Sequence, residues 1–254
     1  MCVFFVGAGP GDPELITVKG QRLLGQADII IYAGSLVNPA LLSLAKNGAA
    51  IYNSASMTLD EVIAVMEQGV SGGKLVVRLH TGDPSIYGAI QEQMDALTAK
   101  QIAFEVIPGV SSFLATAAAL KQEYTLPDVS QTVIITRLEG RTPVPEKEQL
   151  SKLASHEATM CIFLSVHMLD NVVQELVDGG YTSETPVAIV QKASWPDQKI
   201  LRGTLATIAQ VVRESGIDRT AMIVVGKVLS TDYALSRLYA PEFGHMFRQA
   251  QGEK

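Results

Sequence analysis

The chain has 254 residues, of which 47% are hydrophobic and 18% charged, and its formal net charge at pH 7 is −6. This composition is typical of a globular protein with a sizeable core and excludes a disordered chain. The acidic balance argues against nucleic acid as a partner. No apolar run approaches the ~20 residues that a membrane helix requires, and two cysteines are too few for a disulfide framework.

The N-terminus lacks a basic, cleavable signal sequence, so the expected location is the cytoplasm. The four histidines are scattered without the spacing of metal ligands. We therefore expect neither a structural metal nor a segment that spans a membrane.

Strand-like and helical runs alternate along the first half of the chain. The predicted strands cover 2–6, 28–32, 50–52, 74–79 and 103–107, and the helices that follow them cover 13–25, 38–46, 59–68, 86–100 and 112–121. This alternation predicts a mostly parallel sheet covered by helices, with ligands bound beyond the carboxyl ends of the strands.

The pattern breaks at 122–130, which fits neither period and predicts a domain boundary. A hairpin between 187–191 and 199–203 predicts a mixed sheet in the second half. The other strands are expected at 132–136, 160–165 and 222–228, and the helices at 146–156, 169–179 and 205–215. The predicted α/β organisation has an N-terminal domain at 1–121, a C-terminal domain at 122–240 and an extension at 241–254.

The loop at 81–88 reads TGDPSIYG and follows a predicted strand. Gly82 allows close backbone approach to a ligand, Asp83 places a carboxylate at the head of the predicted helix, and Pro84 suits the first turn. A plain helix N-terminus explains the same residues, so this motif alone leaves a structural and a functional interpretation open.

The loop at 7–13 reads GAGPGDP and only partly matches a dinucleotide-binding fingerprint. Asp12 stands where the third glycine is required, and no acid ends the second predicted strand. Pro10 also removes a backbone N–H that a pyrophosphate would need. A nicotinamide-dependent oxidoreductase is therefore disfavoured, and a tight turn capped by Asp12 remains the structural alternative.

A third loop, at 107–112, joins a strand to an alanine-rich helix. Ser111 and Ser112 can cap this helix, and they can equally offer hydroxyl groups to a ligand.

The segments 6–17, 78–84 and 106–112, taken in order, resemble the tetrapyrrole methyltransferases, and the resemblance covers nearly the whole chain. Within this family the chain is most similar to the precorrin-4 methyltransferases of cobalamin biosynthesis. The features that indicate this group lie at 32–37, 57–61, 136–141 and 193–196.

The resemblance implies a two-domain protein, usually a homodimer, that binds S-adenosylmethionine between its domains and methylates carbon 11 of precorrin-4 or cobalt-precorrin-4. Leu164 stands where many relatives have methionine, and Ala193 where many have glycine. By position, the family's cofactor contacts fall on Pro10, Thr81, Gly82, Asp83, Ile86, Ser111, Ser112, Leu164, Ala193, Thr220 and Ala221.

A polycarboxylated substrate needs local cations on an acidic protein. Arg137 and Arg141 follow a predicted strand and can clasp carboxylates bidentately, although solvated loop arginines are the alternative. Tyr32, Ser35 and Tyr87 are further substrate candidates that can equally serve packing. The weaker candidates are Lys19, Lys192, His80 and His167.

Methyl transfer from a sulfonium to a carbon depends on alignment and exclusion of water and needs no nucleophilic side chain. The sequence has no recognisable catalytic triad or carboxylate pair, and it identifies no general base. A related methyltransferase acting on another tetrapyrrole, an RNA or a modified protein would keep the same cofactor site, although the acidic charge disfavours RNA. Whether the substrate carries cobalt is left open.

Overall fold

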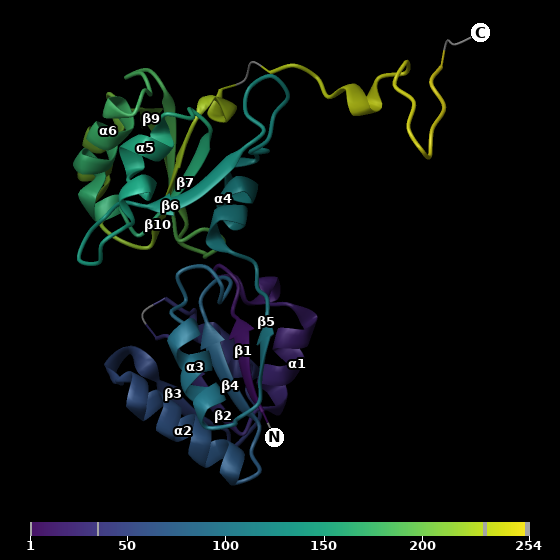
Figure 1. The fold of residues 1–254 in the computed structure, drawn as a ribbon, viewed down its shortest axis with the longest axis vertical. Coiled ribbons are helices and arrows are strands. Elements are labelled where there is room, and N and C mark those ends of the chain that lie inside the picture. The colour runs from purple at the N-terminus through teal and green to yellow at the C-terminus, as the bar shows by residue number, and fades with distance from the viewer. Residues whose placement is uncertain (1, 35, 231–232, 252–254) are drawn as a thin grey trace. The chain divides into compact units, whose positions relative to one another are not determined.

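The computed structural model describes residues 2–34, 36–230 and 233–251. The chain forms two compact units, and each contains one five-stranded sheet (Figure 1). The first unit comprises Met1–Ala119 and Lys192–Lys199, and the second comprises Leu120–Gln191 and Ile200–Lys254. The segment Lys192–Lys199 therefore groups with the first unit, although the sequence around it lies in the second.

All four strand pairs of the sheet in the first unit are parallel, as the βα alternation predicted. Val3 pairs with Val76 and Gly7 with His80, so the central strand and one of its neighbours end level at their carboxyl ends. In spatial order the strands are β3 (Ala50–Asn53), β2 (Ile29–Tyr32), β4 (Val76–His80), β1 (Val3–Gly7) and β5 (Phe104–Ile107).

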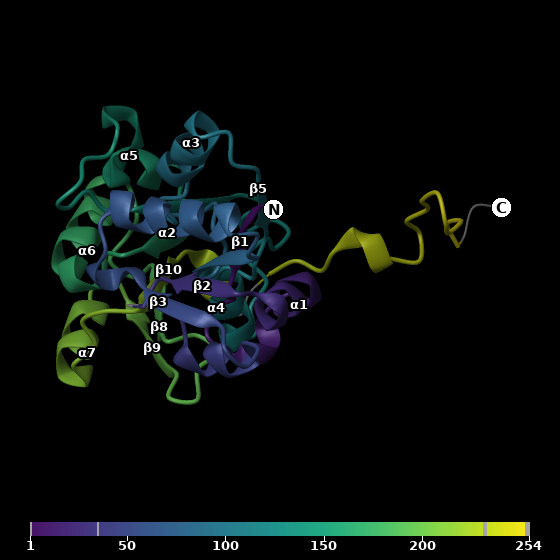
Figure 2. The ribbon, with the colours of Figure 1, turned by 90° about the horizontal axis from the view of Figure 1, so that it is seen from below.

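Helices cover both faces of this sheet (Figure 2). Successive strand residues point to opposite faces, so Val6 contributes to one core cluster and Phe5 to the other. The Val6 cluster includes side chains of α1 (Val18–Gln26), and the Phe5 cluster includes side chains of α2 (Leu59–Ser71) and α3 (Gln91–Ala99). The two cores bury both faces of the sheet, and loops lie at the carboxyl ends of its strands.

Local capping determines where several of these helices begin. Asp12 caps the short helix η1 (Pro13–Leu15), and Thr17 caps α1, so the helix expected over 13–25 is divided into two. Thr58 and Glu61 form a capping box at the start of α2. The segment expected as a helix over 38–46 is the 3-10 helix η2 (Pro39–Leu44), and η3 (Ser54–Ser56) follows β3. The helix α4 (Ser112–Leu120) follows β5.

The prediction of a helix from Ile86 is wrong. The helix α3 begins at Gln91, because Tyr87 and Ala89 have φ angles of 54° and 48°. The backbone also folds tightly at Gly88, where an added Cβ would lie 2.1 Å from the Pro84 carbonyl oxygen. Consequently, residues after β4 form an irregular loop, and Asp83 does not cap a helix.

The sheet of the second unit is mixed, as predicted. The pair β6–β7 is parallel, whereas β10 is antiparallel to both β7 and β8. β9 neighbours β8, in agreement with the expected hairpin. The spatial order is β6 (Val133–Arg137), β7 (Thr159–Phe163), β10 (Ala221–Val225), β8 (Pro186–Gln191) and β9 (Lys199–Thr204).

One core cluster joins this sheet to α5 (Leu150–Ala154), α6 (Leu169–Asp178) and α7 (Ile208–Ser215). Leu169, Val172 and Leu176 recur at helical spacing along α6 and are buried in this cluster. Short 3-10 helices occur at η4 (Glu146–Glu148), η5 (Val166–Met168), η6 (Lys227–Leu229) and η7 (Arg237–Tyr239). Within the described ranges, no helix has the length and apolar character needed to traverse a bilayer.

The topology of the first sheet creates a place for a ligand. β1 and β4 are neighbours, but α1 and α3, the α-helices that follow them, contribute to cores on opposite faces. The two connections therefore diverge at the carboxyl edge, which is the position where open α/β sheets bind ligands.

Candidate functional site

The loops after β1 and β4 are joined backbone to backbone at this edge. The N–H of Gly82 donates to the carbonyl oxygen of Gly9 at 2.8 Å, and the N–H of Gly9 donates to Gly82 at 3.3 Å. Ala8 extends the pairing by donating its N–H to the His80 carbonyl oxygen at 2.7 Å. Gly9 and Gly82 both have positive φ angles, of 76° and 59°, which glycine adopts without strain.

The loop after β5 joins the other two through glycine contacts. A Cβ added to Gly7 would lie 2.6 Å from Gly109 Cα, and one added to Gly109 would lie 2.2 Å from the Gly82 carbonyl oxygen. No side chain fits at either position, so the three loops can converge only because Gly7 and Gly109 are glycines. The three sequence motifs, at 7–13, 81–88 and 107–112, therefore form one cluster of loops in contact with each other.

Asp83 fastens the second of these loops to the third. One of its carboxylate oxygens accepts the N–H of Gly109 at 2.8 Å, and the other accepts the N–H of Ser85 at 2.9 Å as well as the Ser85 hydroxyl. Partial burial opposes ionisation, but the hydrogen bonds from Ser85 and Gly109 outweigh it and hold the pKa of Asp83 below its usual value. Asp83 is therefore an ionised group on a braced loop.

The remaining predicted residues of the first unit lie on or beside these loops. Thr81 donates its hydroxyl to the Leu36 carbonyl oxygen at 3.4 Å, and Tyr87 is 46% exposed. Pro10 and Ser111 are buried, whereas Ile86, Ser112 and Tyr32 are half-buried. Ser35 lies outside the described residues.

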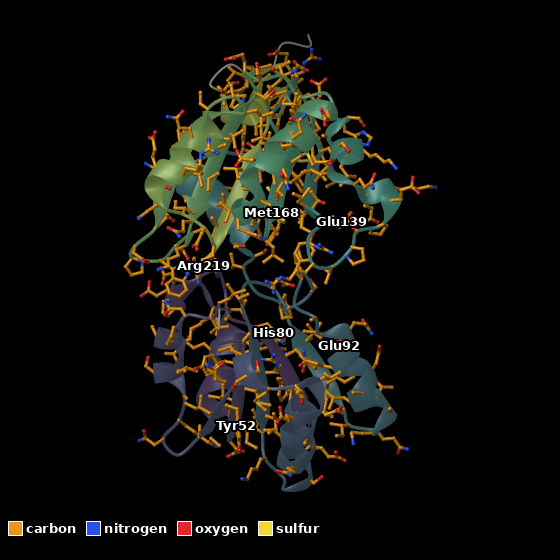
Figure 3. All side chains as sticks on the ribbon, turned by 90° about the vertical axis from the view of Figure 1, so that its left-hand side faces the viewer. Tyr52, His80, Glu92, Glu139, Met168 and Arg219 are labelled. Carbon is orange, nitrogen blue, oxygen red and sulfur yellow. The ribbon has the colours of Figure 1, made fainter. Side chains whose placement is uncertain are left out.

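A second set of predicted residues lies at one edge of the second sheet. β6 and β7 end at this edge and β10 begins there, so Arg137, Leu164, Thr220 and Ala221 are brought to the same side. Figure 3 shows Glu139, Met168 and Arg219, from the segments that adjoin these strand ends, at this end of the second unit. Leu164 and Thr220 have φ angles of 55° and 53°, and Leu164 is 55% exposed. Left-handed backbone at residues other than glycine is uncommon and persists where the surrounding structure imposes it.

The two arginines predicted to bind substrate, Arg137 and Arg141, differ in their hydrogen bonding and exposure. The guanidinium of Arg137 donates to the carbonyl oxygens of Thr142 at 3.1 Å and Pro143 at 2.8 Å, so it organises the loop after β6. Arg141 lies within that loop and is exposed. Of the weaker candidates, Lys19 pairs with Glu105 and Lys192 with Asp197.

His80 (labelled in Figure 3) lies at the carboxyl end of β4 and is 3% exposed. Burial, assisted by the charge of Arg78, lowers its pKa to about 3, so the ring is neutral at pH 7. Arg78 is also buried, and it donates to the Gln93 side chain at 3.1 Å. His80 therefore belongs to the buried interior, whereas His167 is exposed on η5.

Sequence reasoning gave no role to three residues that secure the glycine loop. The indole N–H of Trp195 donates to the Pro10 carbonyl oxygen at 3.0 Å, and the hydroxyl of Ser194 accepts the N–H of Asp12 at 3.0 Å. The side-chain amide of Asn38 donates to the Gly11 carbonyl oxygen at 2.7 Å. The motif containing Trp195 was visible in the sequence, but its partner lies 185 residues away and cannot be identified from a local pattern.

Ala193, the remaining predicted cofactor contact, is 5% exposed and precedes Ser194 in the same segment. It therefore lies beside the glycine loop of the first unit. Within the described ranges, no group of three or more His, Cys, Asp or Glu side chains is arranged to hold a metal ion.

Comparison with known proteins identifies the family. The model of the family described as Tetrapyrrole (Corrin/Porphyrin) Methylases matches residues 2–209. A protein of Methanocaldococcus jannaschii named cobalt-precorrin-4 C(11)-methyltransferase is 61% identical over 249 residues, which are 98% of this chain and 96% of that protein.

Two solved structures support the same assignment. The structure of a cobalt precorrin-4 methyltransferase has a TM-score of 0.88 and 48% identity, and the match covers 90% of this chain and 95% of that one. A uroporphyrin-III C-methyl transferase from Thermus thermophilus, complexed with S-adenosylhomocysteine, has a TM-score of 0.73 and 27% identity, covering 90% and 93%. The resemblance noted in the sequence is thus confirmed: the chain belongs to the tetrapyrrole (corrin/porphyrin) methylases.

Proposed function

We propose that this protein transfers a methyl group from S-adenosylmethionine to carbon 11 of precorrin-4 or cobalt-precorrin-4 in corrin-ring biosynthesis. One observation carries the proposal. The three loops that bear the family motifs meet at the carboxyl ends of the strands of the first sheet, where the connections after β1 and β4 diverge. The chain that forms this arrangement is 61% identical to a protein named cobalt-precorrin-4 C(11)-methyltransferase. The reaction named for that relative is the function that this geometry supports best.

The loops of the first unit suit a ligand with a ribose and an amino-acid portion. Their backbones are fixed by mutual hydrogen bonds, and glycines leave space where side chains would collide. The Asp83 oxygen that accepts the Gly109 N–H has a second lone pair for a ribose hydroxyl or an ammonium group, since a carboxylate oxygen can accept two hydrogen bonds. The first-unit cofactor contacts in this proposal are Pro10, Thr81, Gly82, Asp83, Ile86, Ser111, Ser112 and Ala193.

The second unit is proposed to contribute Leu164, Thr220 and Ala221 to the same cofactor. Leu164 and Thr220 hold backbone conformations that cost of order 1–3 kcal/mol each, which structures retain mainly where surrounding contacts impose them. Leu164 and Ala221 can contact a cofactor through backbone hydrogen bonds and apolar packing, because their side chains carry no charge. This is suitable for an adenine ring, whose faces are apolar.

The bound donor would supply an electrophilic methyl group on a sulfonium. As the substrate carbon forms the new C–C bond, the methyl–sulfur bond breaks and its electron pair returns to sulfur, which neutralises the positive charge. The protein's residues contribute alignment of the two reactants and exclusion of water. Rigid loops, such as those joined by Gly9, Gly82 and Asp83, provide alignment without a nucleophilic side chain.

The substrate side of the proposal depends on Arg137, Arg141, Tyr32, Ser35 and Tyr87. Arg137 already donates hydrogen bonds to carbonyl oxygens of its own loop, so its proposed role is to hold the loop conformation that positions Arg141. Arg141 is exposed and can form a bidentate pair with a macrocycle carboxylate. We further propose a cytoplasmic homodimer that binds no nucleic acid, as the family resemblance and the net charge of −6 suggest.

A calorimetric titration with S-adenosylhomocysteine tests the proposal, with NADH as the control ligand. Saturable binding of S-adenosylhomocysteine alone is expected, and binding of NADH alone would overturn the assignment. Incubation with labelled S-adenosylmethionine and either precorrin-4 or cobalt-precorrin-4 then distinguishes the two substrates. Transfer of label to RNA and not to either macrocycle would support the alternative substrate class, and light scattering measures the oligomeric state.

A further inference from the structure

A single segment, Lys192–Lys199, joins the glycine loop of the first unit to a residue proposed to contact the cofactor. It connects β8 to β9, yet it belongs to the first unit. Ser194 accepts the N–H of Asp12, and Trp195 donates to Pro10, both at 3.0 Å. Two hydrogen bonds therefore attach adjacent residues of this segment to Asp12 and Pro10 of one loop.

The ring of Trp195 also explains Gly11. A Cβ added to Gly11 would lie 2.0 Å from two ring atoms, Cδ1 and Nε1, so any larger residue at position 11 would force the indole to move. Gly11, unlike Gly9, is not placed in the left-handed backbone region, so the requirement at position 11 comes from the indole. Gly11 and Trp195 are thus complementary.

The segment itself is held in a strained conformation. Lys192 and Ser194 have φ angles of 50° and 71°, each costing of order 1–3 kcal/mol. Internal contacts maintain it: the N–H of Ser194 donates to the Gln198 side chain at 2.8 Å, and Lys192 pairs with Asp197. The ammonium of Lys192 lies 5.6 Å from the centre of the Trp195 ring, within cation–π range. Ala193, between the two strained residues, therefore has a fixed backbone.

We infer that Trp195 is a positioning residue of the cofactor site, and that its indole, seated on Gly11, holds Pro10 and Ala193 in the arrangement that binds S-adenosylmethionine. This inference rests on the proposed function, because Pro10 and Ala193 are its cofactor contacts. Trp195 itself touches the loop backbone and not the reacting atoms. Its effect is to remove the cost of ordering two distant backbone segments when the cofactor binds.

The first test measures S-adenosylhomocysteine affinity by calorimetry in Trp195→Phe and in the control Tyr181→Phe. Both substitutions remove one aromatic hydrogen bond to a carbonyl oxygen, that of Trp195 to Pro10 or that of Tyr181 to Ala158, and only the first lies at the glycine loop. Trp195→Phe is expected to weaken binding by about 3- to 10-fold, the loss typical of one hydrogen bond. Tyr181→Phe is expected to bind as the wild type does. Equal affinities of wild type and Trp195→Phe would overturn the inference while leaving the proposed function intact, whereas a wild type that binds no S-adenosylhomocysteine would overturn both.

A thermodynamic cycle separates positioning from general destabilisation. Gly11→Ala is expected to weaken binding by at least 10-fold in the wild type, because the new methyl group displaces the indole. In a Trp195→Ala background the same substitution has no ring to displace and is expected to change affinity less than 2-fold. Equal effects of Gly11→Ala in both backgrounds would contradict the assigned role.

The chain contains one tryptophan, so its fluorescence reports on Trp195 alone. Titration of the wild type with S-adenosylhomocysteine is expected to shift the emission with the same midpoint as the calorimetric titration. The shift is expected to persist in Tyr181→Phe and to be lost in Gly11→Ala at the same ligand concentrations. An emission that stays constant while calorimetry shows saturation would contradict positioning by Trp195.

Discussion

The carboxylate of Asp83 accepts the backbone N–H of Gly109 at 2.8 Å, which ties the loop after β4 to the loop after β5. The same carboxylate accepts two hydrogen bonds from Ser85. Asp83 therefore braces two of the three loops that carry the family motifs, and it does so without being part of a helix. A substitution here tests the architecture of the proposed cofactor site directly.

Asp83→Ala is expected to lower S-adenosylhomocysteine affinity at least 10-fold, because the loop loses its brace and the ligand loses a carboxylate. Asp28→Ala is a matched control. Asp28 accepts the N–H of Leu75 at 2.8 Å and pairs with Lys46, but it lies at the amino ends of the strands. Calorimetry on both variants, with circular dichroism to verify folding, checks the prediction, and an unchanged affinity in folded Asp83→Ala would eliminate its assigned role.

Gly109→Ala is expected to destabilise the protein by about 1–3 kcal/mol, because the methyl group would lie 2.2 Å from the Gly82 carbonyl oxygen. The loop displacement should also abolish S-adenosylhomocysteine binding. In the control Gly25→Ala, the added Cβ meets nothing closer than 3.4 Å, and α1 should keep or gain stability. Urea unfolding of the two variants tests the difference, and equal unfolding free energies would show that the three loops have room to separate.

His80 predicts a specific loss of stability in acid. Its pKa is about 3 in the folded protein, against an ordinary value of 6.5, because burial and the charge of Arg78 disfavour the imidazolium. Between these two pH values the unfolded chain holds one more proton at this site, so stability falls as the pH falls. The contribution is about 1.4 kcal/mol per pH unit, or about 2 kcal/mol between pH 6.5 and pH 5.

His80→Phe is expected to lose this part of the acid sensitivity, since it cannot bind the extra proton. Its ring can occupy the same position, 6.0 Å from Phe5. Unfolding free energies at pH 7.5 and pH 5 should differ less in His80→Phe than in the wild type or in His156→Gln, a substitution of an exposed histidine. The same pH dependence in all three proteins would place the acid sensitivity elsewhere.

Arg141→Ala is expected to weaken binding of a polycarboxylated porphyrin about 3- to 10-fold, since one charge-assisted pair is lost, while S-adenosylhomocysteine affinity is unchanged. The control is Arg213→Ala, which removes an exposed arginine that pairs with Asp170 on another helix of the second unit. Absorbance titrations at two salt concentrations check the electrostatic origin, because an exposed pair weakens as salt rises. Wild-type porphyrin binding by Arg141→Ala would remove Arg141 from the substrate side.

Local sequence patterns predicted much of the fold. The alternation of strands and helices in the first half, the hairpin at β8–β9 and the turn chemistry at Asp12 and Pro13 are properties of a few neighbouring residues, and all appear in the structure. The helix expected from Ile86 is absent at that position because the fold, and not the local sequence, decides the backbone conformation there. Its residues suit a helix locally, but the path of the loop after β4 places Tyr87 and Ala89 in left-handed backbone.

The sequence by itself determined the parallel sheet of the first half, the mixed sheet of the second half, the three glycine loops and the family, because periodicity and motif spacing depend on residues close together in the chain. Only the tertiary structure decided which of these residues act together. In the folded chain Asp83 accepts a hydrogen bond from Gly109, and Arg137 donates to the carbonyl oxygens of its own loop. The indole of Trp195 packs against Gly11. The bond from Trp195 to Pro10 spans 185 residues, and contacts of that separation arise from chain topology and packing, which no short window of sequence contains.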